Sequence, residues 1–431
     1  MVLLRRTNRR TARSSLMPRL LLLIPSTSYR VSDFVSSAHR LGVDVTVGSN
    51  EAQVLGSISN GGTVSIDFKK TRLAVATIEE FNRKYPLSAI VPVDEMTGII
   101  AAEGSKKLGL AHNSPETIRL TGNKLLLRQK LYQNDLPSPN FQKIKLNDNP
   151  IGVSAKLDYP CVLKPLNLSA SQGVIRANNA KEFIIAFERV KKIVLNLKLK
   201  HKMEILPEIL IEEYIEGEEV ALEGVMINGK LNTLALFDKP DPLEGPYFEE
   251  TIYVTPSRKS EEIKYLIKNM AEQAANAIGL NEGPIHIELR ITPKRENANH
   301  RGPCVIEIAA RSIGGLCSRS LKFGDGLTLE DIILNHALGI PILPDREKIS
   351  SGVMMIPIPK AGVLERIDGI LEAQAIKGVN DLKITIPIGS KVLPLPEGNK
   401  YLGFIFAKAK TPNLVEQILR KAFSKLSFKI N

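Results

Sequence analysis

Two apolar segments in the second half of the chain, each interrupted by one glutamate, constrain the fold most. Within residues 283–315, the first segment carries Glu288 between Ile287 and Leu289, and the second carries Glu307 between Ile306 and Ile308. A carboxylate in an apolar strand is costly to bury unless a cation neutralises it. We therefore interpret the segments as paired strands whose glutamates hold a hard divalent cation such as Mg²⁺. A hairpin with solvated glutamates is the alternative on these residues alone.

Two features that follow the second segment support an anion beside such a cation. Arg311 comes four residues after Glu307, close enough to hold an anionic group there. Gly314 and Gly315 come next and free the backbone to turn close to a ligand. A neighbouring histidine, His286, is interpreted as structural rather than catalytic.

The size and composition of the chain fit two or three globular domains. It has 431 residues, of which 43% are hydrophobic and 24% are charged. No run of 18 apolar residues predicts a membrane span. The three cysteines, Cys161, Cys304 and Cys317, have no metal-type spacing. Their small, odd number favours a reducing, cytoplasmic location without a disulfide framework.

The net charge of +12 does not indicate nucleic-acid binding, because it is concentrated at the two ends. Residues 1–16 hold five arginines and no acid, and residues 399–431 hold seven lysines and arginines against one glutamate. The body between them is nearly balanced, which is not the electrostatic footprint of a polyanion-binding protein. We interpret residues 1–16 as a disordered basic extension, with a transit-type segment as the alternative.

The N-terminal third alternates apolar strand patterns with amphipathic helix patterns. They fall at residues 19–25, 32–41, 43–49, 63–68, 73–84 and 88–94. Short connections between such units predict a parallel α/β, Rossmann-like domain. Loops at the ends of its strands are where such sheets bind ligands, and Glu95 lies in one of them. No GxGxxG motif occurs there, so a dinucleotide site is not predicted.

A helical region at 114–139 carries two basic side chains on one face. Ser114 and Pro115 are a helix-start signal, and a second helix begins after Asn123. It has Lys124 in its first turn and Arg128 one turn later. Leu136-Pro137 ends the pattern.

A second constellation lies at residues 159–176. A buried strand ends at Lys164, and a small-residue loop with Ser169, Ser171 and Gly173 follows. A lysine beside such a loop is suited to hold polyphosphate through its charge and the loop's N–H and hydroxyl donors. A surface hairpin with a solvated lysine is the alternative.

The stretch ILIEEYIEGEE at 209–219 is an apolar strand that leads into an acidic turn. Its extended backbone can present groups to an adenine edge, and a carboxylate a few residues later can accept ribose hydroxyls; a charged hairpin turn is the alternative. A hairpin turn at Asn228-Gly229 and a helix at 259–279 follow. The middle third is therefore expected to be a strand-rich α+β unit. The sequence does not indicate which residues of a later segment face a substrate pocket, among Glu249, Glu250 and Tyr253.

The last part of the chain is rich in proline and in short strand-like runs and ends in a basic helix near 412–427. We interpret it as a small β-rich C-terminal domain packed on the middle one. The expected division is an extension at 1–16, an α/β domain at 17–113, an α+β domain at 114–340 and the small domain at 341–431.

Taken together, the motifs resemble the ATP-grasp superfamily in their order and spacing. They are Lys124 in NKLLLRQKL, Lys164 with its Ser/Gly loop, IEEYIEGEE and the Glu288/Glu307/Arg311 segment, and the resemblance covers residues 17–340. The ending EIAARSIGG and the small C-terminal domain look most like carboxylate–amine ligases of the L-amino-acid ligase kind. The resemblance implies a pre-ATP-grasp domain followed by an ATP-grasp domain.

The resemblance also implies cofactors and site residues. It implies ATP with Mg²⁺ or Mn²⁺, the metal being held by Glu288 and Glu307. It implies nucleotide contacts from Lys124, Lys164, Ser169, Ser171, Gly173, Glu212, Glu213, Ile215 and Glu219. The two lysines would bind phosphates under the closing Ser/Gly loop, Glu212 and Ile215 would contact adenine, and Glu219 the ribose. Arg311 and Lys164 would be catalytic, Arg311 at the acyl-phosphate.

Two positions depart from the superfamily pattern. Leu168 and Ala170 stand where relatives often have glycine, and Ala309 stands where many have asparagine. The expected reaction joins a small carboxylate to an amine, both amino-acid-like, through an acyl-phosphate; no nucleic-acid or membrane partner is expected, and a homodimer is left open. The alternatives are another ATP-grasp reaction such as carboxylation or carbamoyl-phosphate synthesis, a nucleotide-binding regulatory protein, and a Rossmann oxidoreductase.

Overall fold

The structure is a computed structural model that describes residues 17–26, 28–51, 61–201, 206–292 and 302–431. The basic extension expected at residues 1–16 lies outside this described part. Within it, no helix combines the length and the apolar character needed to cross a membrane.

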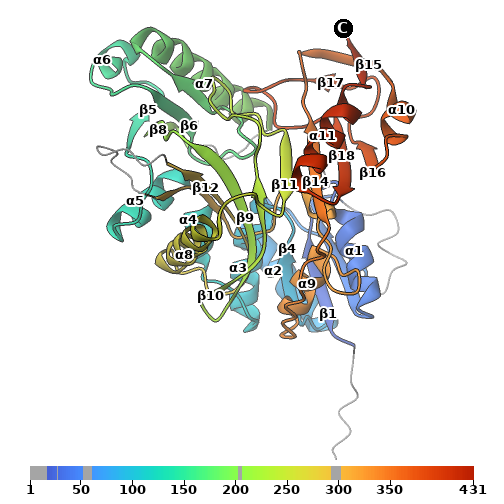
Figure 1. Cartoon of the computed structure of the whole chain (residues 1–431). Helices are drawn as coiled ribbons and strands as arrows, with labels where there is room; N and C mark the ends of the chain where they lie inside the picture. The colour runs from blue at the N-terminus through green and yellow to red at the C-terminus, as the bar shows by residue number, and fades with distance from the viewer. Residues whose placement is uncertain (1–16, 27, 52–60, 202–205, 293–301) are drawn as a thin grey trace, which may run out of the picture.

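The N-terminal part is a four-stranded parallel sheet with the order β3-β2-β1-β4 (Figure 1). Its strands are β1 (Arg19–Leu23), β2 (Asp44–Ser49), β3 (Thr63–Ser65) and β4 (Ala89–Pro92). The helices between and after them are α1 (Val31–Arg40), α2 (Thr71–Lys84) and α3 (Glu95–Leu108). The four leucines of β1 are fully buried, as a strand covered on both faces requires. The parallel α/β prediction is confirmed.

An eight-stranded sheet forms the centre of the molecule, in the order β13-β12-β9-β10-β11-β14-β18-β16. All of its neighbouring pairs are antiparallel. The strands are β9 (Glu218–Ile227), β10 (Lys230–Asp238), β11 (Ile252–Thr255), β12 (Gly283–Ile291), β13 (Pro303–Ala309), β14 (Ser350–Ile356), β16 (Val379–Ile384) and β18 (Gly403–Ala409). Asn228 and Gly229 both have positive φ, at 51° and 76°, as the predicted β9–β10 turn requires.

A separate four-stranded sheet, β5-β8-β6-β7, lies above one end of the central sheet (Figure 1). It is built from β5 (Phe141–Lys145), β6 (Cys161–Pro165), β7 (Ile175–Ala177) and β8 (Glu208–Glu213). Helix α7 (Ala180–His201) covers it through buried Phe183 and Phe187, and the short α6 (Pro150–Ser154) packs on α7. We call this unit the lid.

Five further helical segments complete the part before residue 340. They are α4 (Pro115–Thr121), α5 (Lys124–Gln133), α8 (Glu261–Ala277), the 3₁₀ helix η1 (Cys317–Ser320) and α9 (Leu329–Ala337). Apolar residues of α5 and α8 share a core with β9, β12 and β13. The strands expected to carry the metal glutamates are therefore held rigidly from behind.

The C-terminal strands extend the central sheet instead of forming only a sheet of their own. β14 pairs with β11 of the preceding region, and β18 and β16 follow in the same sheet. A small sheet of β17 (Lys391–Val392), β15 (Gly362–Asp368) and β19 (Ser427–Ile430) lies beside them with α10 (Ile370–Gln374) and α11 (Pro412–Phe423). The central sheet thus contains strands from both sides of the boundary expected at residue 341.

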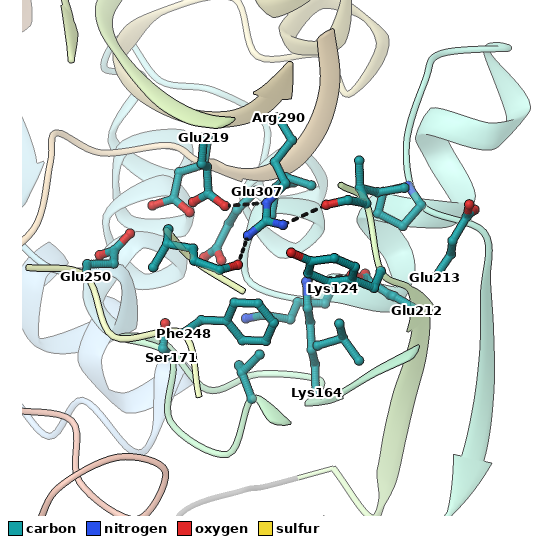
Figure 2. A pocket seen from close by; sticks show the side chains of 18 of the residues that line it. Lys124, Lys164, Ser171, Glu212, Glu213, Glu219, Phe248, Glu250, Arg290 and Glu307 are labelled. Carbon is teal, nitrogen blue, oxygen red and sulfur yellow. Dashed lines mark hydrogen bonds and ion pairs between the residues drawn. The ribbon is translucent and has the colours of Figure 1, made fainter. Parts of the chain in front are cut away.

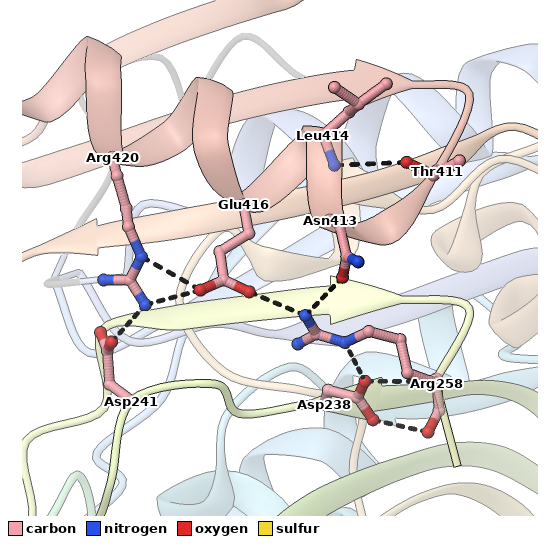
Figure 3. Close-up of polar contacts among 9 residues, drawn as sticks. Asp238, Asp241, Arg258, Thr411, Asn413, Leu414, Glu416 and Arg420 are labelled. Carbon is pink, nitrogen blue, oxygen red and sulfur yellow. Dashed lines mark hydrogen bonds and ion pairs between the residues drawn. The ribbon is translucent and has the colours of Figure 1, made fainter. Parts of the chain in front are cut away.

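Ion pairs join α11 to the segments that follow β10 and β11 (Figure 3). Glu416 contacts Nη1 of Arg258 at 2.9 Å and Nη2 of Arg420 at 2.8 Å. Arg258 in turn binds Asp238, and Arg420 binds Asp241. These contacts fix the C-terminal part against the centre of the molecule from one side.

Candidate active site

One cavity between the lid and the central sheet collects most of the predicted site residues (Figure 2). Its lining includes Lys124, Lys164, Ser169, Ser171, Glu212, Glu213, Ile215, Glu219, Glu288 and Glu307. Lys164 comes from the lid and Glu307 from the central sheet, so distant segments meet around one space. Gly173 and Arg311 do not line this cavity.

The two predicted metal glutamates lie directly opposite each other. In the β12–β13 pair, Glu288 is the Cα partner of Glu307, and a register shift follows immediately. Directly opposed residues of an antiparallel pair point to the same face of the sheet. Strand alternation therefore turns both carboxylates toward the cavity, away from the apolar side chains between them.

A lysine that the sequence analysis did not select lies among these carboxylates. The Nζ of Lys239, at the end of β10, is 2.7 Å from Oε1 of Glu219 and 3.2 Å from Oε1 of Glu288, and it also contacts Glu250. Its side chain is 3% exposed. Burial alone would lower the pKa of Lys239, but the surrounding carboxylates hold it well above its usual value.

The same three carboxylates form a group that suits a divalent cation. One oxygen from each of Glu219, Glu250 and Glu288 lies within 4.8 Å of the others. Carboxylate oxygens at such spacing are the ligands that Mg²⁺ and Mn²⁺ prefer. Burial raises the pKa of Glu250, and the nearby Glu288 carboxylate adds to that shift while Lys239 opposes it. The residues present therefore fit a magnesium ion, with Glu307 facing the same cavity.

Side-chain caps start α4 and α5, and α5 carries Lys124. Ser114 accepts a hydrogen bond from the Thr117 N–H at the start of α4, and Asn123 accepts from two N–H groups at the start of α5. This places Lys124 at the first position of α5, where its Nζ donates to the Leu168 carbonyl at 2.6 Å. Lys124 thereby reaches the β6–β7 loop, residues 166–174.

Lys164 is held by a buried ion network with Glu212 and Arg128. The Nζ of Lys164 lies 2.6 Å from Oε2 of Glu212, and Nε of Arg128 lies 2.7 Å from the other oxygen. Burial raises the pKa of Glu212, but Arg128 and Lys164 outweigh it and lower the pKa to about 2. The Glu212 carboxylate is thus engaged by two cations and holds Lys164 in place; the predicted adenine contact of Glu212, which lines the cavity, stays a prediction.

An arginine missed by the sequence analysis organises the other end of the cavity. Arg290 lies two residues after Glu288 on β12 and so projects to the same face. Its Nε donates to Glu219 at 2.9 Å, and its Nη1 donates to the Ile215 carbonyl at 2.6 Å. Tyr214 lies under its guanidinium, at 5.0 Å, and Phe248 also lines the space. Two aromatic rings therefore line this end of the cavity, and a nucleobase can stack on such rings.

The β6–β7 loop has a backbone that glycine would adopt at lower cost. Ala170 and Ser171 have φ of 54° and 53°, and each such residue costs about 1–2 kcal/mol. Ala170 was one of the positions where relatives have glycine. Gly173 has φ of 73°, and a Cβ there would come within 2.7 Å of the Pro165 ring. Its N–H donates to the Pro396 carbonyl, away from the cavity.

Arg311 lies outside this cavity, beside Glu95. Its Nη2 is 3.6 Å from Oε2 of Glu95, and its Nη1 donates to the Ser312 carbonyl at 3.0 Å. Burial opposes the charge of Arg311, but Glu95 and Glu307 raise its pKa above the usual value. Oε2 of Glu95 is buried and has no hydrogen-bond partner among the described residues. A cationic and an anionic side chain therefore lie beside each other, with Glu307 close to Arg311.

His286 lies between two carboxylates. Its Nδ1 lies 3.0 Å from Oε2 of Glu223, and its Nε2 lies 3.4 Å from Oε1 of Glu288. Glu223 also accepts hydrogen bonds from the Ile313 N–H. Burial lowers the pKa of His286, but these carboxylates raise it to about 9. The imidazolium links Glu288 to the buried Glu223.

Comparison with known families identifies three regions of the chain. Residues 157–320 match the ATP-grasp domain, and residues 35–112 match the ATP-grasp N-terminal domain. Residues 354–431 match the L-amino acid ligase C-terminal domain 2.

Individual relatives are distant but cover much of the chain. An uncharacterised protein, y4rH of Sinorhizobium fredii strain NGR234, is 22% identical over 98% of this chain and 85% of its own length. Alanine–anticapsin ligase of Bacillus subtilis strain 168 is 24% identical over 61% of this chain. The match covers 56% of that ligase, so this chain spans only about half of its length.

Solved structures agree with the family models. The crystal structure of L-amino acid ligase from Bacillus licheniformis has a TM-score of 0.78 and 25% identity, over 96% of this chain and 99% of that one. Together with the cavity geometry, these matches show that the chain has an ATP-grasp domain of the kind found in ATP-dependent ligases, followed by the C-terminal domain 2 of L-amino acid ligases.

Proposed function

We propose that this protein joins the carboxylate of an amino acid to an amine, using ATP and releasing ADP and phosphate. The observation that carries the proposal is the meeting of Lys124, Lys164, Glu288 and Glu307 around one cavity, with the Arg311–Glu95 pair beside it. The first four suit a triphosphate with its cation. The pair suits a substrate that carries both charges.

The nucleotide enters with its base in the slot next to Ile215, Tyr214 and Phe248. Lys124 and Lys164 then neutralise phosphate oxygens, and Ser169 and Ser171 of the β6–β7 loop donate hydrogen bonds to them. Glu288 and Glu307 would hold a Mg²⁺ ion, with Glu219 and Glu250 close to Glu288, and the ion would supply charge neutralisation for the phosphates.

The acceptor substrate lies on the other side of Glu307. Its ammonium binds the Glu95 carboxylate, which makes no hydrogen bond through Oε2 among the described residues, and Arg311 holds its carboxylate close to the γ-phosphate. A carboxylate oxygen attacks the γ-phosphorus as the bond to the β-phosphate oxygen breaks, which gives ADP and an acyl-phosphate. The neutral amine of the second substrate then attacks the acyl carbon. Phosphate leaves with its electron pair, and the amine's proton passes to solvent.

A panel of amino acids and small carboxylates, each paired with amines, tests this function. ADP release and the amide product are measured for each pair. We expect ADP only when both substrates are present, and more from amino acids than from carboxylates without an ammonium group. ADP release that needs bicarbonate instead would identify a different ATP-grasp reaction.

A nucleotide-binding regulatory role is the second candidate. It is favoured by Ala309, which replaces a polar side chain two residues after Glu307, and by the non-glycine residues of the β6–β7 loop. Tight ATP binding without ADP release from any substrate pair would support that role and overturn the ligase proposal.

A further inference from the structure

A segment of the C-terminal part, residues 394–397, reaches across to the β6–β7 loop, and we call it the strap. The Pro396 carbonyl accepts a hydrogen bond of 2.9 Å from the Gly173 N–H. The Glu397 carbonyl accepts one of 2.7 Å from Nε2 of Gln172, which is 6% exposed. Both contacts lie on the side of the loop that faces away from the nucleotide cavity, since Gln172 and Gly173 are absent from its lining.

The strap is itself anchored to the lid by a two-pronged ion pair. Nε and Nη2 of Arg189, on α7, lie 2.7 and 2.9 Å from the two oxygens of Glu397. The Arg189 guanidinium also donates to the Tyr247 hydroxyl and lies 5.0 Å from the centre of its ring. A bidentate pair of this kind fixes orientation as well as distance. The strap therefore grips the lid at two places, on the loop and on α7.

The loop needs such support because of its own sequence. Ala170 and Ser171 hold left-handed backbone conformations that glycine adopts without a steric penalty. Contacts within the loop, such as the Val174 N–H to the Ser171 carbonyl, are few. A loop of this composition would otherwise spend much of its time in other conformations. The strap supplies partners for the loop on the side away from the cavity.

We propose that the strap positions the β6–β7 loop for the nucleotide phosphates, with Glu397 and Arg189 as its positioning residues. The proposal rests on the proposed function in one respect, namely that Ser169 and Ser171 of this loop meet the phosphates. Holding the loop in its binding conformation removes the ordering step from ATP binding. The C-terminal part of the chain thereby contributes to nucleotide affinity without touching the nucleotide.

Glu397→Gln tests the strap, because it removes the charge of the pair but leaves the Glu397 carbonyl in place. Glu416→Gln is the matched control. Glu416 also joins the C-terminal part to the rest of the molecule through arginines, but its contacts lie at α11 and not at the loop (Figure 3). Both glutamate side chains are partly exposed, at 36% and 20%, so neither substitution threatens the core.

Two measurements are made on the full chain. The first is amide hydrogen exchange of residues 166–174 without nucleotide, and we expect faster exchange in Glu397→Gln only. The second is the Kd for a non-hydrolysable ATP analogue with Mg²⁺, which should rise roughly three- to tenfold in Glu397→Gln as the ordered fraction of the loop falls. At saturating ATP, kcat should change less than KM. Exchanging the pair, Arg189→Glu with Glu397→Arg, should restore the affinity.

The outcomes separate the strap from the ligase proposal. Unchanged loop exchange in Glu397→Gln, or equal effects in Glu416→Gln, would overturn the strap even if the chain proves to be a ligase. Faster loop exchange with weaker analogue binding would support the strap even if no substrate pair releases ADP. Faster loop exchange with unchanged analogue affinity would also overturn it, because the loop would then not serve the nucleotide.

Discussion

Replacing Glu212 by glutamine perturbs the buried ion network at the base of the cavity. The Glu212 side chain is 1% exposed, and it lies between Arg128 and Lys164 at 2.7 and 2.6 Å. Glutamine is nearly the same size, but it has no charge and only one acceptor oxygen. Glu212→Gln therefore leaves two cations without their shared counter-charge while changing the packing little.

Two estimates of the loss in unfolding free energy agree, one from the pKa of Glu212 and one from buried ion pairs in other proteins. A pKa of about 2, against an ordinary value of 4.5, corresponds to about 3 kcal/mol at 1.36 kcal/mol per pKa unit. Removing one partner of a buried pair costs roughly 3–5 kcal/mol in other proteins. We therefore expect Glu212→Gln to lower the free energy of unfolding by about 3 kcal/mol near neutral pH.

The assay is urea unfolding of the purified chain, with Glu208→Gln as the control. Glu208 lies on the same strand, but its partner Lys143 is 53% exposed, so the pair contributes less than about 1 kcal/mol. The difference between wild type and Glu212→Gln should also depend on pH. The depressed pKa of Glu212 means that its contribution is complete above pH 4.5 and is lost as the pH falls toward about 2.

Equal, small losses in the two variants would refute this reasoning. So would a difference between wild type and Glu212→Gln that does not change between pH 5 and pH 3. In either case the Glu212 carboxylate would not be the counter-charge of Lys164, and the cavity would owe its shape to other contacts.

Three further predictions concern the reaction. Glu307→Ala should abolish substrate-dependent ADP release while leaving the circular dichroism spectrum intact, and wild-type ADP release would refute its role. Arg311→Ala should lower kcat at least tenfold with little change in the Kd for ATP, because Arg311 lies outside the nucleotide cavity; equal losses of both would count against this placement. Removing divalent cations with a chelator should stop ADP release, and added Mg²⁺ or Mn²⁺ should restore it; turnover that survives chelation would exclude Glu288 and Glu307 as metal ligands.

The parts of the site that the sequence predicted are those set by local pattern. The placement of Glu288 opposite Glu307 follows from two apolar strands joined by a short polar segment. The place of Lys124 follows from the capping residue before it. Both depend on backbone hydrogen bonds and strand alternation, which neighbouring residues determine. The parallel sheet of the N-terminal part was predictable for the same reason.

The parts that were missed depend on contacts between distant segments. Lys239 ends a strand in an ordinary polar turn, and only the fold brings it to carboxylates from β9, β12 and the segment before β11. The pairing of β11 with β14 was missed as well, because nothing in the sequence of either strand indicates its partner. Arg290 is different, because it could have been predicted from the sequence. It lies two residues after Glu288, and residues at that spacing in a strand project to the same face.

The isotope content of the released phosphate tests the acyl-phosphate route most directly. The amino acid that the substrate panel identifies is labelled with ¹⁸O in its carboxylate, and the phosphate formed with the amine present is analysed by mass spectrometry. Attack of the carboxylate on the γ-phosphate predicts one ¹⁸O atom in each phosphate and one ADP for each amide. Unlabelled phosphate, or AMP in place of ADP, would contradict the account.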